Sequence, residues 1–174
     1  PSINTNEEAL DLIVQAIEKS KLKPGIDIAI CLDVAANELI NDKGEYCVKS
    51  KNFINADEVI SYYEKLTSNY PIKSIEDPFA ENDWESWKKI TKVIGNNIQI
   101  VGDDLLVTNV KRLEKGIKEK SANSILVKPN QIGTLTETLE VITLAKKANF
   151  KTIISHRSGD TEDTFIADLA VATN

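Results

Sequence analysis

Hydrophobic positions along the chain fall into short apolar runs that alternate with longer segments of helical period. The runs are rich in Ile and Val and lack strict polar alternation, which is typical of strands covered on both faces. We predict strands at Ile26–Leu32, Ile72–Ile75, Ile98–Val101, Ser124–Val127 and Thr152–Ser155. Runs of this kind indicate a parallel sheet whose faces are both buried.

The segments before and between these runs carry apolar residues at the spacing of an amphipathic helix. We predict helices at Asn6–Ser20, Ala56–Tyr70, Asp83–Ile94, Val110–Lys120 and Leu135–Ala148. Thr5 or Asn6 could cap the first helix, because short polar side chains accept the unpaired N–H groups of a first turn. Residues Asn37–Val48 predict a small hairpin that turns at residues 41–44.

Strands that alternate with helices imply parallel βαβ units. The chain lacks a glycine-rich phosphate-binding fingerprint, so a nucleotide site is poorly supported. A closed eight-stranded β/α barrel needs about 250 residues, and this chain has 174. Two folds remain open: a doubly wound open sheet, or most of a barrel with units missing. The chain begins at Pro1, contains no Met and ends without a stop signal such as Gly or Pro. We therefore expect part of a longer protein, which favours the partial barrel.

Composition excludes only a few classes of function. Hydrophobic residues make up 41% and charged residues 28%, and the net charge is −6. An acidic chain without a basic stripe argues against a nucleic-acid partner. The apolar runs are too short to span a bilayer, and no secretory signal opens the chain. Cys31 and Cys47 are therefore interpreted as reduced thiols of a cytoplasmic protein.

Every predicted strand stops on ionisable or polar groups. These are Asp33, then Glu76 and Asp77, then Asp103 and Asp104, then Lys128, and finally His156, Arg157 and Ser158. A single carboxylate after a strand often caps a helix or forms a salt bridge. Five strand ends in succession are better explained by an active site, because the carboxyl ends of β/α strands meet at one mouth.

Convergent carboxylates repel one another unless a cation neutralises them. Mg²⁺ prefers oxygen ligands and suits a few carboxylates together with waters and substrate oxygens. We predict that Asp33, Glu76 and Asp103 are its ligands. Asp77 and Asp104 are the second members of their pairs, and successive strand residues point to opposite faces. We expect the side chains of Asp77 and Asp104 to point towards helix caps or to lie behind the metal ligands.

Lys128 ends a buried run, which favours a chemical role over a helix-capping or ion-pairing role. A lysine in a partly desolvated, cationic site can act as a base. Pro129 is expected to hold the following turn extended and so to fix the direction of the lysine. Arg157 and Ser158 suit a phosphate or carboxylate. His156 is the only histidine, and a structural role is as well supported as a catalytic one.

Several ordered stretches resemble enolases, the glycolytic phosphopyruvate hydratases. They are LDVAANE, SIEDPFAENDW, VGDDLLVTN, ILVKPNQIGTLTETL and SHRSGDTEDTFIADLAVAT. The resemblance implies an α/β fold, the C-terminal β/α barrel domain, here with about five parallel β/α units. It implies that Asp33, Glu76 and Asp103 bind the "conformational" Mg²⁺ and that Lys128 removes the C2 proton of 2-phosphoglycerate. His156, Arg157 and Ser158 would contact the substrate, with Arg157 on its phosphate.

The resemblance also implies what residues 1–174 do not contain. The N-terminal α+β domain, the glutamates that assist hydroxide departure and the last barrel units would lie elsewhere, so this segment alone is expected to be inactive. A complete protein would be a cytoplasmic homodimer or larger oligomer. Two alternatives stay open: another member of the enolase superfamily, and a non-catalytic binding module at the cell surface, for example for plasminogen. Unpaired edges of an incomplete barrel should also favour association or marginal stability.

Overall fold

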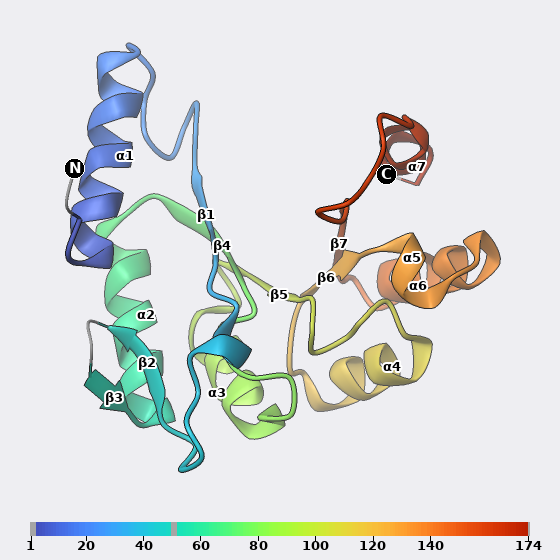
Figure 1. The fold of residues 1–174 in the computed structure, drawn as a ribbon, viewed down its shortest axis with the longest axis horizontal. Helices are drawn as coiled ribbons and strands as arrows, with labels where there is room; N and C mark the ends of the chain where they lie inside the picture. Colours follow the sequence, from blue (N-terminus) through green and yellow to red (C-terminus); the bar gives the residue numbers. More distant parts are fainter. Residues whose placement is uncertain (1–2, 50–51, 174) are drawn as a thin grey trace.

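A computed structural model describes residues 3–49 and 52–173 and shows a curved sheet with helices along its outer side (Figure 1). The sheet has five strands in the order β1, β4, β5, β6 and β7, which is also their order along the chain. Their bounds are Ile30–Asp33, Ile72–Glu76, Gln99–Gly102, Ser124–Val127 and Lys151–Ile154. Each neighbouring pair is parallel. A doubly wound sheet reverses its strand order at a switch point, so the continuous order identifies part of a β/α barrel.

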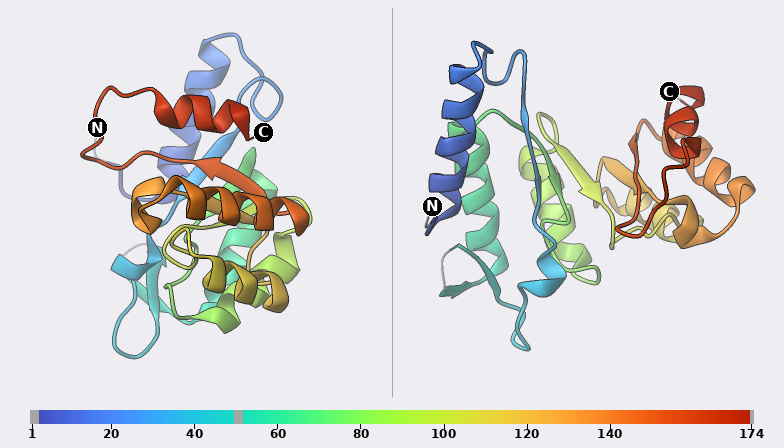
Figure 2. Two further views of the ribbon diagram at one scale, coloured as in Figure 1. Left: turned by 90° about the vertical axis from the view of Figure 1, so that its right-hand side faces the viewer. Right: turned by 45° about the horizontal axis from the view of Figure 1, so that its top comes forward.

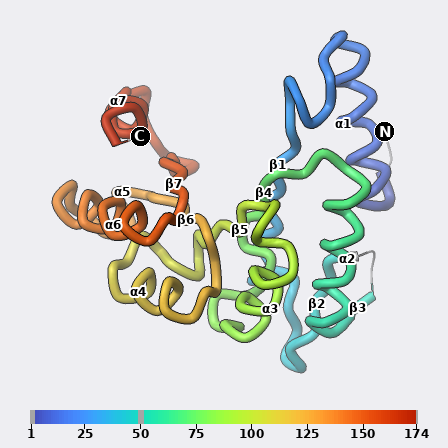
Figure 3. Tube along the Cα trace, turned by 180° about the vertical axis from the view of Figure 1, so that it is seen from behind, coloured from blue at the N-terminus to red at the C-terminus, as the bar shows by residue number. Residues whose placement is uncertain are grey.

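The helices cover the convex face of this sheet. Their bounds are α1 Asn6–Lys19, α2 Ala56–Asn69, α3 Trp84–Ile94, α4 Val110–Glu119, α5 Pro129–Ile132, α6 Leu135–Lys147 and α7 Phe165–Ala172. Figure 3 shows α2, α3, α4 and α6 following the outer side of the strands. In the right-hand view of Figure 2, α1 and α7 lie at opposite ends of the sheet. Among the described residues, no helix combines the length and the apolar character needed to cross a membrane.

The core lies between the outward side chains of the strands and the apolar faces of these helices. Ile75, Ile100 and Ile125 on successive strands are fully buried, as are Trp87 on α3 and Leu113 on α4. Burying a side chain of this size stabilises the fold by about 1.5–3 kcal/mol. This core holds the strands in register, and the register places the carboxyl ends side by side.

Most predicted elements are confirmed with ends that shift by one or two residues. Strand β6 has the predicted bounds Ser124–Val127. Thr5 is the N-cap of α1, and its hydroxyl accepts the N–H of Glu8. Asn6 is the first residue of the helix instead, and its side chain donates to the carbonyl of Val48 at 2.7 Å. The same amide also lies 3.1 Å from the hydroxyl of Tyr62 on α2.

Strand β1 begins at Ile30, so the prediction that it starts at Ile26 is wrong. Gly25 has φ +79° and opens a turn, which leaves the Ile26 side chain 79% exposed. The predicted turn at residues 41–44 is present, because the N–H of Gly44 donates to the carbonyl of Asn41. The regular pairing comes later than predicted, between β2 (Tyr46–Lys49) and β3 (Asn52–Ile54). A short 3-10 helix at Ala36–Glu38 precedes this hairpin.

The segment after β6 also differs from expectation. Lys128 is extended, with φ −118° and ψ 100°, but Pro129 is the first residue of the short helix α5. The expectation of an extended turn after Pro129 is therefore wrong. Proline has no N–H to satisfy and its fixed φ suits the first helical position. The residue before proline is the one kept extended.

Candidate active site

Four ionisable residues stand at the carboxyl ends of neighbouring strands. Asp33 is the last residue of β1 and Glu76 the last of β4, and the two are register partners. Asp103 follows β5 directly, and Lys128 follows β6. Because the strands are parallel, these ends meet on one edge of the sheet. The residues predicted as metal ligands and base therefore come from four adjacent strands.

Lys128 and Asp103 form the closest charged contact of this edge. The lysine ammonium lies against Oδ2 of Asp103, and the two side chains are only 16% and 11% exposed. The Gln131 side-chain amide lies 3.4 Å from the other Asp103 oxygen, Oδ1. A charge pair shielded from water in this way is held more firmly than a surface pair. The contact fixes the direction of the lysine Nζ towards the carboxylates.

Glu76 lies among the other charges of the site. Burial, followed by the nearby carboxylates of Asp33, Asp103 and Asp77, raises the pKa of Glu76 to about 7, and Lys128 opposes this shift. One ammonium is thus shared by several carboxylates. Grouped carboxylate oxygens with too little positive charge among them are the donor set that a hard divalent cation prefers. The residues present fit the metal that the enolase resemblance implies.

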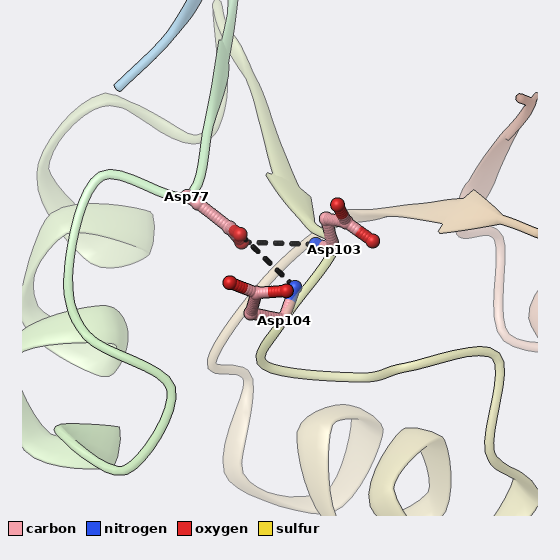
Figure 4. A group of neighbouring side chains, drawn as sticks. All are labelled: Asp77, Asp103 and Asp104. Atoms are coloured by element: carbon pink, nitrogen blue, oxygen red, sulfur yellow. Dashed lines mark hydrogen bonds between the residues drawn. The ribbon is translucent and has the colours of Figure 1, made fainter. Parts of the chain in front are cut away.

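Asp77 has a different position from its neighbour Glu76. Its two carboxylate oxygens accept the backbone N–H groups of Asp103 at 2.9 Å and Asp104 at 3.0 Å (Figure 4). The side chain is 4% exposed, and its backbone is left-handed with φ +42°. Burial raises the pKa of Asp77 to about 7, and the two N–H donors oppose that shift. Asp77 therefore holds the turn that carries Asp103.

The carboxylates that meet the distance requirement for a metal ion form a different group from the predicted ligands. One oxygen each from Asp77, Asp103 and Asp104 lies within 4.8 Å of the others. Both oxygens of Asp77 are occupied by backbone donors, however, and Asp104 accepts the side-chain amide of Asn37 at 2.7 Å. Figure 4 shows the Asp103 carboxylate directed away from Asp77. The ligand set of Asp33, Glu76 and Asp103 therefore stays a prediction, beside the group of Asp77, Asp103 and Asp104.

The predicted substrate-contacting residues occupy the loop after β7. His156, Arg157 and Ser158 are all exposed. The His156 Nδ1 lies 2.9 Å from the Arg157 carbonyl, and the Arg157 N–H donates to Asp160. These hydrogen bonds stay inside the loop and do not join it to Lys128 or the carboxylates. The loop thus lies at the same edge of the sheet as Lys128 and the carboxylates, but these hydrogen bonds do not bring its side chains to them.

Sequence reasoning missed three polar residues at this edge. Thr108 is fully buried and its hydroxyl accepts the N–H of Lys128 at 2.8 Å. Gln131 contacts Thr108 and Asp103. Asn37 joins Asp104 to the N–H of Glu81. The residue types give little signal, because uncharged polar residues after strands are common. Only the close spacing of Gln131 to Lys128 could have suggested a contact.

Comparison with known proteins agrees with this geometry. Residues 1–174 match the family described as enolase, C-terminal TIM barrel domain. The chain is 62% identical over 174 residues to an enolase of Pelagibacter ubique (strain HTCC1062), an alignment that covers 100% of this chain and 41% of the relative. The chain thus spans less than half the length of that curated relative. The matched family, the continuous strand order and the charged strand ends agree, and the chain belongs to the enolase C-terminal TIM barrel domain family.

Proposed function

We propose that this chain is the metal-binding and proton-abstracting part of an enolase, which reversibly dehydrates 2-phosphoglycerate to phosphoenolpyruvate with Mg²⁺. The observation that carries the proposal is the Lys128–Asp103 contact beside Glu76 at the strand ends. The 62% identity to an enolase over the whole chain supports it. A different carboxylate substrate is less well supported, because the substrate-loop sequence SHRSG also resembles enolases.

Each residue has a separate task in this reaction. Asp33, Glu76 and Asp103 would hold the metal through carboxylate oxygens. When bound, Mg²⁺ supplies positive charge that stabilises the enolate formed by loss of the C2 proton. Lys128 accepts that proton at Nζ in its neutral amine form, and the electron pair of the C–H bond moves into the substrate carboxylate. Enolase-superfamily sites are themselves a standard example of a Lys or His base beside Mg²⁺ ions, so this scheme is the known one for the class.

The substrate phosphate is assigned to the loop after β7. Arg157 offers a planar set of donors that matches phosphate oxygens, and Ser158 adds a hydroxyl donor. His156 contacts the substrate beside them. Since all three side chains are exposed, the loop can close on a substrate without breaking core contacts. We infer that substrate binding brings this loop to the charged group.

The remaining parts of the reaction are assigned to segments outside these 174 residues. In this proposal, an N-terminal α+β domain and further barrel units belong to the same polypeptide and supply the acid that protonates the departing hydroxide. The complete protein is a cytoplasmic homodimer or larger oligomer. The mouth of its barrel would then contain both Lys128 as the base and the acid supplied by the other segments.

Conversion of 2-phosphoglycerate with Mg²⁺ tests the proposal. The assay compares the 174-residue chain with the complete polypeptide that contains it. We expect phosphoenolpyruvate from the complete polypeptide and none above background from the chain alone. An inactive complete polypeptide would overturn the enolase function. Activity of the chain alone would overturn the division of the site between segments.

A further inference from the structure

A closed ring of contacts surrounds the proposed base. The Lys128 backbone N–H donates to the Thr108 hydroxyl at 2.8 Å, and that hydroxyl donates to Oε1 of Gln131 at 2.9 Å. The Gln131 amide nitrogen donates to Oδ1 of Asp103 at 3.4 Å. The other Asp103 oxygen contacts Nζ of Lys128, which closes the ring. The ring therefore contacts Lys128 both at its backbone N–H and at Nζ, the end of its side chain.

The chemistry of each group fixes the direction of the hydrogen bonds. A backbone N–H only donates, so the Thr108 oxygen must accept from Lys128. The single Thr108 hydroxyl proton is then available to Gln131, whose carbonyl oxygen accepts it. This leaves the Gln131 NH₂ group to face the Asp103 carboxylate, which only accepts when ionised. A hydroxyl is needed at position 108, because it must both accept and donate.

The backbone at Thr108 supports a specific role for this side chain. Val107 has φ +43° and Thr108 has φ +51°, although both are β-branched and disfavour the left-handed region. The turn is held by the carbonyl of Asp103, which accepts the N–H groups of Leu106 and Val107. Thr108 is fully buried in this turn. Unfavourable backbone of this kind persists where surrounding contacts demand it, often beside active sites.

We propose that Thr108 and Gln131 are positioning residues that aim the Lys128 amine at the C2 proton of the substrate. The proposal rests on the enolase function above. A second bond supports the aim, because the Gln131 backbone N–H donates to the Lys128 carbonyl at 2.9 Å. Lys128 is thus anchored at its N–H, its carbonyl and its ammonium. Proton transfer depends steeply on such aim, and a displacement near 1 Å can cost about a hundredfold in rate.

The variant Thr108→Val in the complete polypeptide tests the proposal. Valine keeps the β-branched shape, so the backbone strain is unchanged while both hydrogen bonds of the hydroxyl are lost. Thr138→Val is the matched control, because Thr138 is also fully buried and its hydroxyl donates to the carbonyl of Thr134, the N-cap of α6. Thr108→Ser restores the hydroxyl without the methyl group. These three variants separate the hydroxyl at position 108 from the general cost of losing a buried hydroxyl.

Two readouts decide the outcome. In metal-free protein, hydrogen exchange of the Lys128 amide should accelerate at least about tenfold in Thr108→Val but not in Thr138→Val. In the enzyme assay, Thr108→Val should lower kcat about tenfold to a hundredfold, leave KM within about twofold, and raise the kinetic isotope effect with substrate deuterated at C2. Thr108→Ser should restore most of kcat. A merely structural role would lower stability without changing the isotope effect.

The failures are distinguishable. An active wild type whose Thr108→Val variant behaves like Thr138→Val, in exchange or in kcat, would overturn the positioning role alone. A wild type without dehydration activity would overturn the enolase function and, with it, the role assigned to Thr108. The amide exchange does not depend on activity, so it reports the Thr108–Lys128 hydrogen bond in either case.

Discussion

Asp103 is the residue on which the interactions of the candidate site converge. Its backbone N–H donates to Asp77, and its carboxylate contacts both Lys128 and Gln131. It also belongs both to the ligand set proposed with Asp33 and Glu76 and to the group with Asp77 and Asp104 whose oxygens lie within 4.8 Å of one another. Experiments on Asp103 itself therefore cannot distinguish the two groups. Residues that belong to only one group can.

Glu76→Gln and Asp104→Asn together identify the metal group. Each change removes one negative charge and keeps the shape of the side chain. We expect Glu76→Gln to weaken Mg²⁺ binding to the complete polypeptide by at least about tenfold. Loss of a direct metal ligand should cost at least as much affinity as loss of a residue that only hydrogen-bonds to a ligand. Asp104→Asn should change the affinity by less than about threefold. Isothermal titration calorimetry measures both, and the opposite ranking would favour the group formed by Asp77, Asp103 and Asp104.

Among the elements, helix α2 shows how local sequence fixes an end. Asn55 is its N-cap, and the Asn55 side chain accepts the N–H groups of Asp57 and Glu58. The Glu58 carboxylate accepts the Asn55 N–H in return, which completes a capping box. The helix then buries Tyr63 and Leu66 against the sheet. The capping box thus fixes where α2 begins.

Removal of this cap should destabilise the fold without touching the site. Asn55→Ala is expected to lower the free energy of unfolding by about 1 kcal/mol, the usual cost of losing an asparagine cap. Asn69→Ala is the control, because Asn69 is also exposed and is the last residue of the same helix. Urea unfolding of the complete polypeptide provides the measurement. Equal effects of the two variants would show that the capping box contributes nothing measurable.

How far the elements can be predicted depends on which signal each one carries. Strand β6 and the start of α1 are predicted correctly, because an isolated apolar run and a threonine cap are local signals. The predicted start of β1 is wrong, because Ile26 is apolar and yet follows the turn at Gly25. Helix α7 is not predicted, because its apolar residues surround most of the helix and leave no clear polar stripe.

The candidate site is predictable in its charges but not in its contacts. The alignment of parallel strand ends needs only the order of the elements, so Asp33, Glu76, Asp103 and Lys128 can be grouped from sequence. The ring through Thr108 and Gln131 depends on a left-handed turn and on a helix that begins at Pro129. No residue pattern specifies how such a turn is aimed. Tertiary packing decides it.

For the molecule as a whole, the sheet has two ends that lack a strand partner among the described residues. Strand β1 pairs only with β4, and β7 pairs only with β6. The first helix also leaves apolar surface uncovered, since Leu12 and Ile13 are each nearly half exposed. Open edges and apolar surface both favour pairing with another chain. The described residues therefore leave strand edges and apolar surface without a partner.

The isolated chain should accordingly associate or be only marginally stable. We expect light scattering after gel filtration to show dimers or larger species, and the fraction of these should rise with protein concentration. Lengthening the chain to the complete polypeptide should remove this open-ended association and leave one defined oligomer. A stable, monodisperse monomer of the 174-residue chain would contradict the prediction.

Turnover by the Lys128→Ala variant of the complete polypeptide is the decisive experiment. Lys118→Ala is the matched control, because Lys118 is an exposed lysine on α4, away from the strand ends. With Mg²⁺ and 2-phosphoglycerate, Lys128→Ala should lower kcat about a thousandfold, as expected for loss of a general base. It should keep Mg²⁺ affinity within about threefold, and Lys118→Ala should match wild type. Wild-type turnover by Lys128→Ala would contradict the assignment of Lys128 as the base.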